Sequence, residues 1–232
     1  MSRAARIAIA KTAAALALLL AGCADKPATP EWQMNAKSGI DRSVAAYLEG
    51  DSRVEAQEFE GVRNAIARTG RPALLARAEL VRCATRVASL VLDDCAAYRP
   101  LEADAEPAER AYAAYLFGRA SPADVALLPE QHRAIAAAPA GPASALAALE
   151  RMNDPLARLV GAAVLLQTGR ADRDVVARAV DTASAQGWRR PLLAWLQVQA
   201  RQAEAAGDTV EAARIRRRIG VVERVASAAS SP

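Results

Sequence analysis

The chain has 232 residues, of which 53% are hydrophobic and only 4% aromatic, and its 30 Lys and Arg, 26 Asp and Glu and single His give a net charge of +4. With only 12 Gly and 12 Pro, this composition excludes a disordered or collagen-like chain. Because Ala, Leu and Val supply most of the apolar content and strand-favouring patterns are nearly absent, the composition favours an all-α fold.

The first 22 residues differ from the rest of the chain. Arg3, Arg6 and Lys11 make a positive start, and an apolar run of about ten residues follows at 12–21. A bilayer core requires roughly 20 apolar residues, so this run is too short to span it. Residues 1–22 are therefore predicted to be a secretory signal peptide.

The end of this segment, Leu20, Ala21, Gly22 and Cys23, resembles the lipobox of bacterial lipoproteins. The resemblance implies that Cys23 is lipidated and becomes the first residue of the mature protein. By the same family rule, Ala24 at the next position implies transport to the outer membrane, with the protein anchored by lipid on its periplasmic face. The alternative is an incidental thiol beside an ordinary cleavage site.

Removal of the signal leaves 232 − 22 = 210 residues and a net charge of 4 − 3 = +1. A nearly neutral protein has no overall field that attracts nucleic acid, so no nucleic-acid partner is expected. Residues 23–37 contain two prolines and no helical period, and are predicted to form the lipidated N-terminus and a tether on which Trp32 contacts the domain or the lipid interface. A single helical domain is expected over 38–226 and a disordered tail over 227–232.

Capping residues, prolines and glycines mark the expected helices in chain order. Ser38 and Asp51 are candidate caps of the first two helices, and the pairs Ser121-Pro122 and Asp154-Pro155 carry the same start signal. On the last helix Ala212, Ile215, Ile219 and Val222 recur at helical spacing, which predicts that they face another helix. The expected helices are 38–50, 51–70, 72–91, 107–118, 155–168, 172–186, 190–206 and 208–225.

Residues 192–219 have the form helix, Gly-Asp turn, helix, and corresponding helix starts (155 and 191, 172 and 208) lie 36 residues apart. This pattern resembles tetratricopeptide and related helical-hairpin repeats. The resemblance implies antiparallel helical hairpins stacked in an α-solenoid. The prolines at 129, 139 and 142 interrupt the middle of the chain, so an irregular helical bundle is the alternative.

Cys83 and Cys95 are the two cysteines that follow Cys23, and in an oxidising periplasm such a pair is predicted to form a disulfide. Twelve residues of continuous helix would separate the two Cα atoms by about 18 Å, whereas a disulfide needs roughly 6 Å. The helix must therefore end or turn back between Ala88 and Asp94. Two free buried thiols, or redox or metal chemistry, are the alternatives.

His132 is the only histidine, and it is expected to be a solvated or capping side chain at a helix start rather than a catalytic base. Two cysteines beside one distant histidine do not make a zinc site, so no metal and no cofactor are expected. Neither a nucleophile elbow nor a glycine-rich phosphate loop is present. The aromatic residues that lie at helical spacings or helix starts are expected to pack in the core: Tyr112, Tyr115, Trp188 and Trp195.

A basic stripe on the last helix lies opposite its apolar seam and is formed by Arg214, Arg217, Arg218 and Arg224. It is interpreted either as a solvated face partly paired with glutamates 211 and 223, or as a site for an acidic partner or anionic lipid headgroups.

The leading functional hypothesis is a non-enzymatic helical scaffold that binds another protein of the cell envelope. One alternative is an envelope hydrolase that cleaves peptidoglycan with paired carboxylates. Another is a carrier with a small-ligand cavity between its hairpins. The candidate carboxylates of the hydrolase are Glu79, Asp93, Asp94, Glu102 and Asp104.

Overall fold

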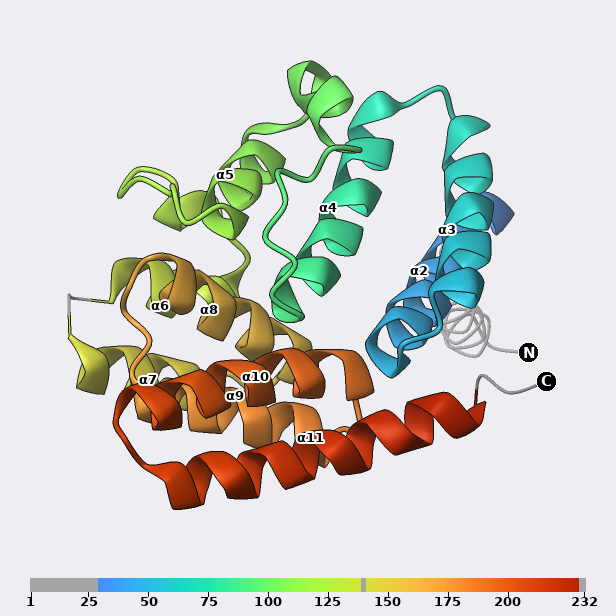
Figure 1. Cartoon of the computed structure of the whole chain (residues 1–232). Helices are drawn as coiled ribbons and strands as arrows, with labels where there is room; N and C mark the ends of the chain where they lie inside the picture. Colours follow the sequence, from blue (N-terminus) through green and yellow to red (C-terminus); the bar gives the residue numbers. More distant parts are fainter. Residues whose placement is uncertain (1–28, 139–140, 230–232) are drawn as a thin grey trace, which may run out of the picture.

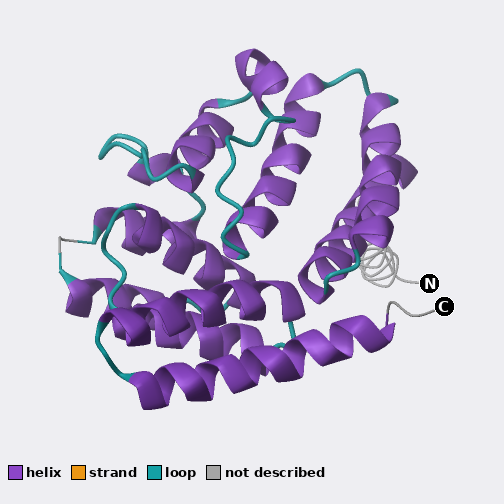
Figure 2. Cartoon of the chain, viewed as in Figure 1, coloured by secondary structure: helices purple, strands orange, loops and turns teal. Residues whose placement is uncertain are grey.

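The computed structural model describes residues 29–138 and 141–229, and within these ranges the fold is all-α, without strands (Figure 2). The three helices within residues 31–88 and the three within residues 173–229 run in different directions (Figure 1). The element bounds are α2 (Glu31–Glu49), α3 (Ser52–Ala67), α4 (Pro72–Ala88), η1 (Arg99–Asp104), α5 (Pro107–Leu116), η2 (Val125–Leu127), α6 (Glu130–Ala137), α7 (Pro142–Glu150), α8 (Pro155–Gln167), α9 (Arg173–Ala185), α10 (Arg189–Ala205) and α11 (Thr209–Ala229).

The first helix begins earlier than the sequence indicated. Helix α2 starts at Glu31, so the predicted tether over 23–37 is wrong for its last seven residues, and Ser38 lies inside the helix instead of capping it. The carbonyl of Pro30 accepts hydrogen bonds from the backbone N–H groups of Gln33 and Met34 and so begins the helix. Pro30 itself has no backbone N–H group to donate. The residues after it keep their N–H groups and can therefore form the hydrogen bonds of a helix.

Helices α2 and α3 form a tight antiparallel hairpin. Asp51 caps α3 as predicted, since its Oδ1 accepts hydrogen bonds from the N–H groups of Arg53 at 3.1 Å and Val54 at 2.9 Å. The helices approach closely where Gly39 faces Val62, because a Cβ atom at position 39 would lie 2.7 Å from a Val62 methyl group. A glycine is therefore required there for the observed packing.

Helix α4 is the wall shared by two hydrophobic cores. Ala78 packs with the α2–α3 hairpin around Phe59 and Val62, whereas Leu80 and other residues of α4 belong to the main core that extends to α11. In Figure 1, α4 stands between the α2–α3 hairpin and α5. Trp195 and Tyr115 are fully buried in the main core, which confirms their predicted packing role.

The chain reverses direction after α4. The helix ends at Ala88, and Leu90 adopts a left-handed backbone with φ of 59°. The returning segment brings Cys95 beside Cys83, with a Cα–Cα distance of 5.5 Å. The predicted break between Ala88 and Asp94 is confirmed, and the two cysteines lie at disulfide distance.

The middle of the chain follows its proline signals only in part. Ser121 donates hydrogen bonds from its N–H and Oγ to Asp124, both at 2.7 Å, but the expected α-helix after Pro122 is wrong, because only a turn and the short η2 follow. Conversely, Pro129 and Pro142 occupy helix starts, and α6 and α7 fill much of the segment that the prolines were expected to interrupt. Proline fits the first turn of a helix, where its missing N–H has no intrahelical partner.

The C-terminal helices α8, α9, α10 and α11 each pack against the next in chain order. Their predicted bounds are confirmed within a few residues, and Asp154 and Asp172 cap α8 and α9. On α11, Ala212 and Ile215 are fully buried against the core. Helix α11 continues to Ala229, so the predicted disordered tail is wrong for residues 227–229, where alanines extend the helix.

The cysteine pair should contribute measurably to stability. Replacing Cys83 with Ser should lower the free energy of unfolding by about 3 kcal/mol, because the unfolded chain regains the entropy of a short closed loop. Urea denaturation of the oxidised wild type and the variant measures the difference. Reduction with dithiothreitol should lower the free energy of unfolding of the wild type to that of the variant and leave that of the variant unchanged. Equal free energies of unfolding under oxidising conditions would contradict the disulfide.

Candidate functional site

The exposed side of α11 presents a continuous basic and apolar surface. Val210, Arg214, Arg217, Val221 and Arg224 follow one another at spacings of four, three, four and three, which places them on one face of the helix. Val210 is 80% exposed and Val221 54% exposed. We call these five residues the α11 surface, and they lie opposite the buried stripe that begins with Ala212.

Some of the arginines on α11 are occupied by ion pairs and some are not. Arg214 holds Glu211 through two hydrogen bonds of 2.6 Å, which lowers the pKa of that carboxyl group, and Arg216 pairs with Glu204. Arg217, Arg218 and Arg224 have no ion pair within residues 29–138 and 141–229. The interpretation of a partly paired face therefore applies to Arg214, while Arg217 and Arg224 are available to a partner.

The net positive charge of residues 23–232 lies on this helix. Residues 209–229 contain five Arg and two Glu, a net charge of 5 − 2 = +3. Because the chain from residue 23 onward carries +1, the remainder carries 1 − 3 = −2. Helix α11 thus has a local positive field, which favours an acidic partner.

The candidate carboxylates do not gather in one place. Glu79 and Asp93 line the same cavity of about 180 Å³ beside the cysteine pair. Glu79 is buried and its carboxylate lies 2.7 Å from Nε of Arg63, whereas Asp93 is exposed and lies 4.0 Å from Arg86. The other three candidates are on the exposed surface outside that cavity: Asp94, which pairs with arginines 99 and 119, Glu102, and Asp104.

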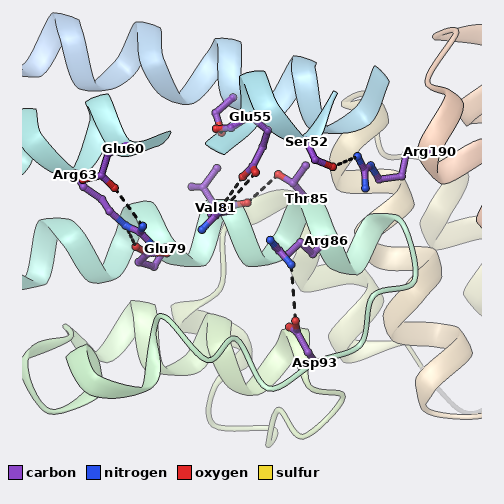
Figure 3. A network of polar contacts seen from close by, with 12 residues as sticks. Ser52, Glu55, Glu60, Arg63, Glu79, Val81, Thr85, Arg86, Asp93 and Arg190 are labelled. Atoms are coloured by element: carbon purple, nitrogen blue, oxygen red, sulfur yellow. Dashed lines mark hydrogen bonds and ion pairs between the residues drawn. The ribbon is translucent and has the colours of Figure 1, made fainter. Parts of the chain in front are cut away.

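Glu79 belongs to an ion-pair network between α3 and α4 that sequence reasoning missed (Figure 3). Glu55 of α3 receives two hydrogen bonds from Arg82 of α4, at 2.6 and 3.1 Å, and Arg63 of α3 binds Glu79 of α4. The guanidinium groups of Arg82 and Arg63 lie 4.8 and 5.1 Å from the ring centroid of Phe59. Each helix thus supplies one carboxylate and one guanidinium group, which fixes their relative position.

A cavity with mainly apolar walls lies between α4, α5 and η2, and we call it the α4–α5 cavity. Its volume is about 350 Å³. Arg77 and Glu109 form an ion pair of 2.6 Å at its edge. The apolar and aromatic side chains in its wall are Leu80, Val81, Ala108, Tyr112, Leu127, Leu128 and Pro129. Such a volume is at the lower end of the range for small-molecule sites.

His132 lies behind this cavity and is not a solvated or capping residue as predicted. It is only 2% exposed, because positions 132 and 135 of α6 both face the interior, and its ring packs on Tyr112 and Tyr115 with centroids 5.4 and 4.9 Å apart. Burial lowers the pKa of His132 to about 4, against a smaller opposing effect of Asp154. Burial also raises the pKa of both tyrosines. All three rings are therefore neutral at neutral pH.

Neither a membrane-spanning helix nor a cluster of metal ligands is present in the described part of the chain. No helix there has the length and hydropathy needed to cross a bilayer, and no three His, Cys, Asp or Glu side chains are grouped so as to hold a metal ion. Cys23 lies outside the described residues.

Comparisons with protein-family models, characterised proteins and solved structures gave no match to this chain. Its function is therefore inferred from its own residues.

The burial of His132 predicts a pH dependence of stability. The unfolded chain binds a proton at this residue below about pH 6.5, whereas the pKa of about 4 keeps the folded form neutral. The contribution of the neutral His132 ring to the free energy of unfolding is therefore complete above pH 6.5. Up to about 3 kcal/mol of it is lost as the pH falls toward 4.

Urea denaturation of wild type and His132→Gln at several pH values isolates this effect, because the carboxylates titrate in both proteins. The difference in free energy of unfolding between the two proteins should shrink as the pH falls from 7 to 4. A difference that stays constant over this range would show that His132 is not buried as a neutral ring.

Proposed function

We propose that this chain is a lipoprotein of the outer membrane, anchored on the periplasmic side through Cys23, whose helical body is a non-enzymatic module that binds another envelope protein. The observation that carries the binding function is the α11 surface, which combines arginines with exposed valines on the last helix in chain order. The sequential packing of α8 to α11 supports the proposed likeness to tetratricopeptide hairpins.

The chemistry of the α11 surface favours an acidic partner with some apolar side chains. Arginine presents several N–H donors in a planar fork that matches a carboxylate group. Arg217 and Arg224 lie seven residues apart, about two helical turns, with Val221 between them. A partner segment with spaced Asp or Glu side chains would satisfy both arginines while covering Val221.

The position of α2 limits how far the body can lie from the membrane. Seven residues, 24–30, separate Cys23 from the first residue of α2. A fully extended chain of this length spans at most about 25 Å. If Cys23 carries lipid, the helical body is held close to the membrane, where it meets other envelope proteins.

A carrier of small ligands is the second candidate function. It is favoured by the α4–α5 cavity, whose walls are mainly apolar and whose volume of about 350 Å³ suits a small ligand. The two functions use different surfaces of the molecule and can be tested separately.

Charge reversal on the α11 surface tests the binding function. Arg217→Glu with Arg224→Glu should lower recovery of the cross-linked envelope partner by about tenfold, because two solvent-accessible donors become repulsive charges. The matched control is Arg53→Glu with Arg68→Glu, which makes the same change of charge at exposed sites on and just after α3. Quantitative mass spectrometry after cross-linking in intact envelopes compares the variants.

Equal recovery from both double variants would contradict the role of the α11 surface. If wild-type protein recovers no specific partner above background, the binding function itself is contradicted.

Lipid attachment is tested by metabolic labelling with a clickable palmitate analogue and by intact mass. The wild type should begin at residue 23 and carry fatty acid, while Cys23→Ala should carry none, because the thiol is the proposed site of acylation. Variants of Cys83 and Cys95 should retain the label and serve as controls. A wild-type protein that keeps residues 1–22, or carries no fatty acid, would overturn the anchor.

A further inference from the structure

The α4–α5 cavity has one polar edge and apolar walls. Buried Leu80 and Leu128 line it together with Tyr112, and the exposed Leu127 of η2 lies at its mouth. At its edge, Nε of Arg77 donates a hydrogen bond of 2.6 Å to Oε1 of Glu109. A ligand that fits this site must therefore carry an extended apolar part and a polar group at one end.

The available group at the polar edge is a guanidinium. Glu109 is buried and uses one carboxylate oxygen to hold Nε of Arg77, whereas the side chain of Arg77 is 65% exposed. The two terminal nitrogens of Arg77 have no hydrogen-bond partner in the described part of the chain. They are oriented by the bond at Nε and retain N–H donors for an anionic oxygen.

In the described part of the chain, the charged side chains that line this cavity are Arg77 and the buried Glu109. Tyr112 forms part of its wall, and the neutral His132 ring lies behind Tyr112, with Nε2 3.5 Å from the tyrosine hydroxyl oxygen. An anionic group therefore finds its attraction at Arg77, while the apolar part of the ligand displaces water from leucine, valine and proline side chains.

We propose that the α4–α5 cavity binds a single-chain amphiphile with a carboxylate head group, such as a medium-chain fatty acid, with the carboxylate on the terminal nitrogens of Arg77. Glu109 is buried and holds Arg77 through Oε1, while its Oε2 has no hydrogen-bond partner in the described part of the chain, so the exposed charge that a head group meets is Arg77. A volume of about 350 Å³ suits one short chain rather than a two-chain lipid. The inference deepens the second candidate function and does not require Cys23 lipidation or the α11 surface.

Photolabelling of the full mature protein in membranes tests the site. The probe is dodecanoic acid with a diazirine in its chain, and the comparison probe is the corresponding alcohol. Acid-dependent cross-links should map to peptides containing 77–81, 108–112 and 127–129, and unlabelled dodecanoic acid should compete. Arg77→Gln should reduce labelling by the acid about tenfold, because a hydrogen bond to a charged group is lost, and should leave labelling by the alcohol unchanged.

Two further variants keep the test decisive. Arg178→Gln removes an arginine from an exposed pair with Glu150, also 2.6 Å long, and should label like the wild type. Leu127→Asp places a negative charge at the mouth on an exposed residue, so it should weaken labelling by the acid even if Arg77→Gln folds poorly. The charge-reversed α11 variant should also label normally, which separates this inference from the partner-binding function.

The proposal is overturned if cross-links lie outside these three segments or are not competed by dodecanoic acid. It is also overturned if folded Arg77→Gln, or Leu127→Asp, labels like the wild type with the acid probe. Loss of the acid and alcohol signals to the same extent in folded Arg77→Gln would show that Arg77 maintains the site and does not recognise the carboxylate, which also overturns the proposal.

Discussion

The end of α4 is the constraint on which the rest of the structure depends. The indole N–H of the fully buried Trp195 donates a hydrogen bond of 3.0 Å to the carbonyl of Ala88, one of the carbonyl groups that a helix end leaves without an intrahelical donor. This bond ties α10 to α4 across 107 positions of sequence. At the same end the chain reverses through Leu90, and the pairing of Cys83 with Cys95 holds the returning segment against α4.

On the side of α4 that faces α3, ion pairs hold the two helices together in addition to apolar packing. The reciprocal pairs between α3 and α4 place Glu55 and Glu79, both buried, against Arg82 and Arg63. The gain from such pairs is largely offset by desolvation, but removing one member leaves a buried charge without a partner. They therefore determine where the α2–α3 hairpin docks more than they raise stability. Arg190 adds a second connection, because it donates hydrogen bonds to the Tyr47 carbonyl at 2.7 Å and to Ser52 Oγ at 2.8 Å.

The two proposed sites lie on opposite kinds of surface. The α11 surface is exposed, and Arg217 and Arg224 have no ion pair in the described part of the chain, so it suits a partner that brings its own carboxylates. The α4–α5 cavity is concave, and Arg77 is the charge that it presents to a ligand. Because α4 contributes to the cavity and to both cores, its position links the ligand site to the packing of the whole molecule.

The sequence alone determined the features that depend on residues close to one another in the chain. Helix starts at Asp51, Asp154 and Asp172 follow from one side chain and the next backbone donors, and the buried stripe and basic face of α11 follow from helical spacing. The need for a break between Cys83 and Cys95 followed from helix dimensions. Local signals gave the wrong helix start at Pro30 and Ser38. A proline can mark a loop or the start of a helix, and a serine can cap a helix or lie within it.

Only the tertiary structure decided which distant side chains meet. The pairing of Arg77 with Glu109 joins residues 32 positions apart, and the burial of His132 depends on α5 and α8 covering α6. A lone arginine or histidine in a sequence carries no local sign of its partner, because helices pack by the shape of their whole faces. For that reason the ion-pair network and the α4–α5 cavity became visible only once the helices were in place.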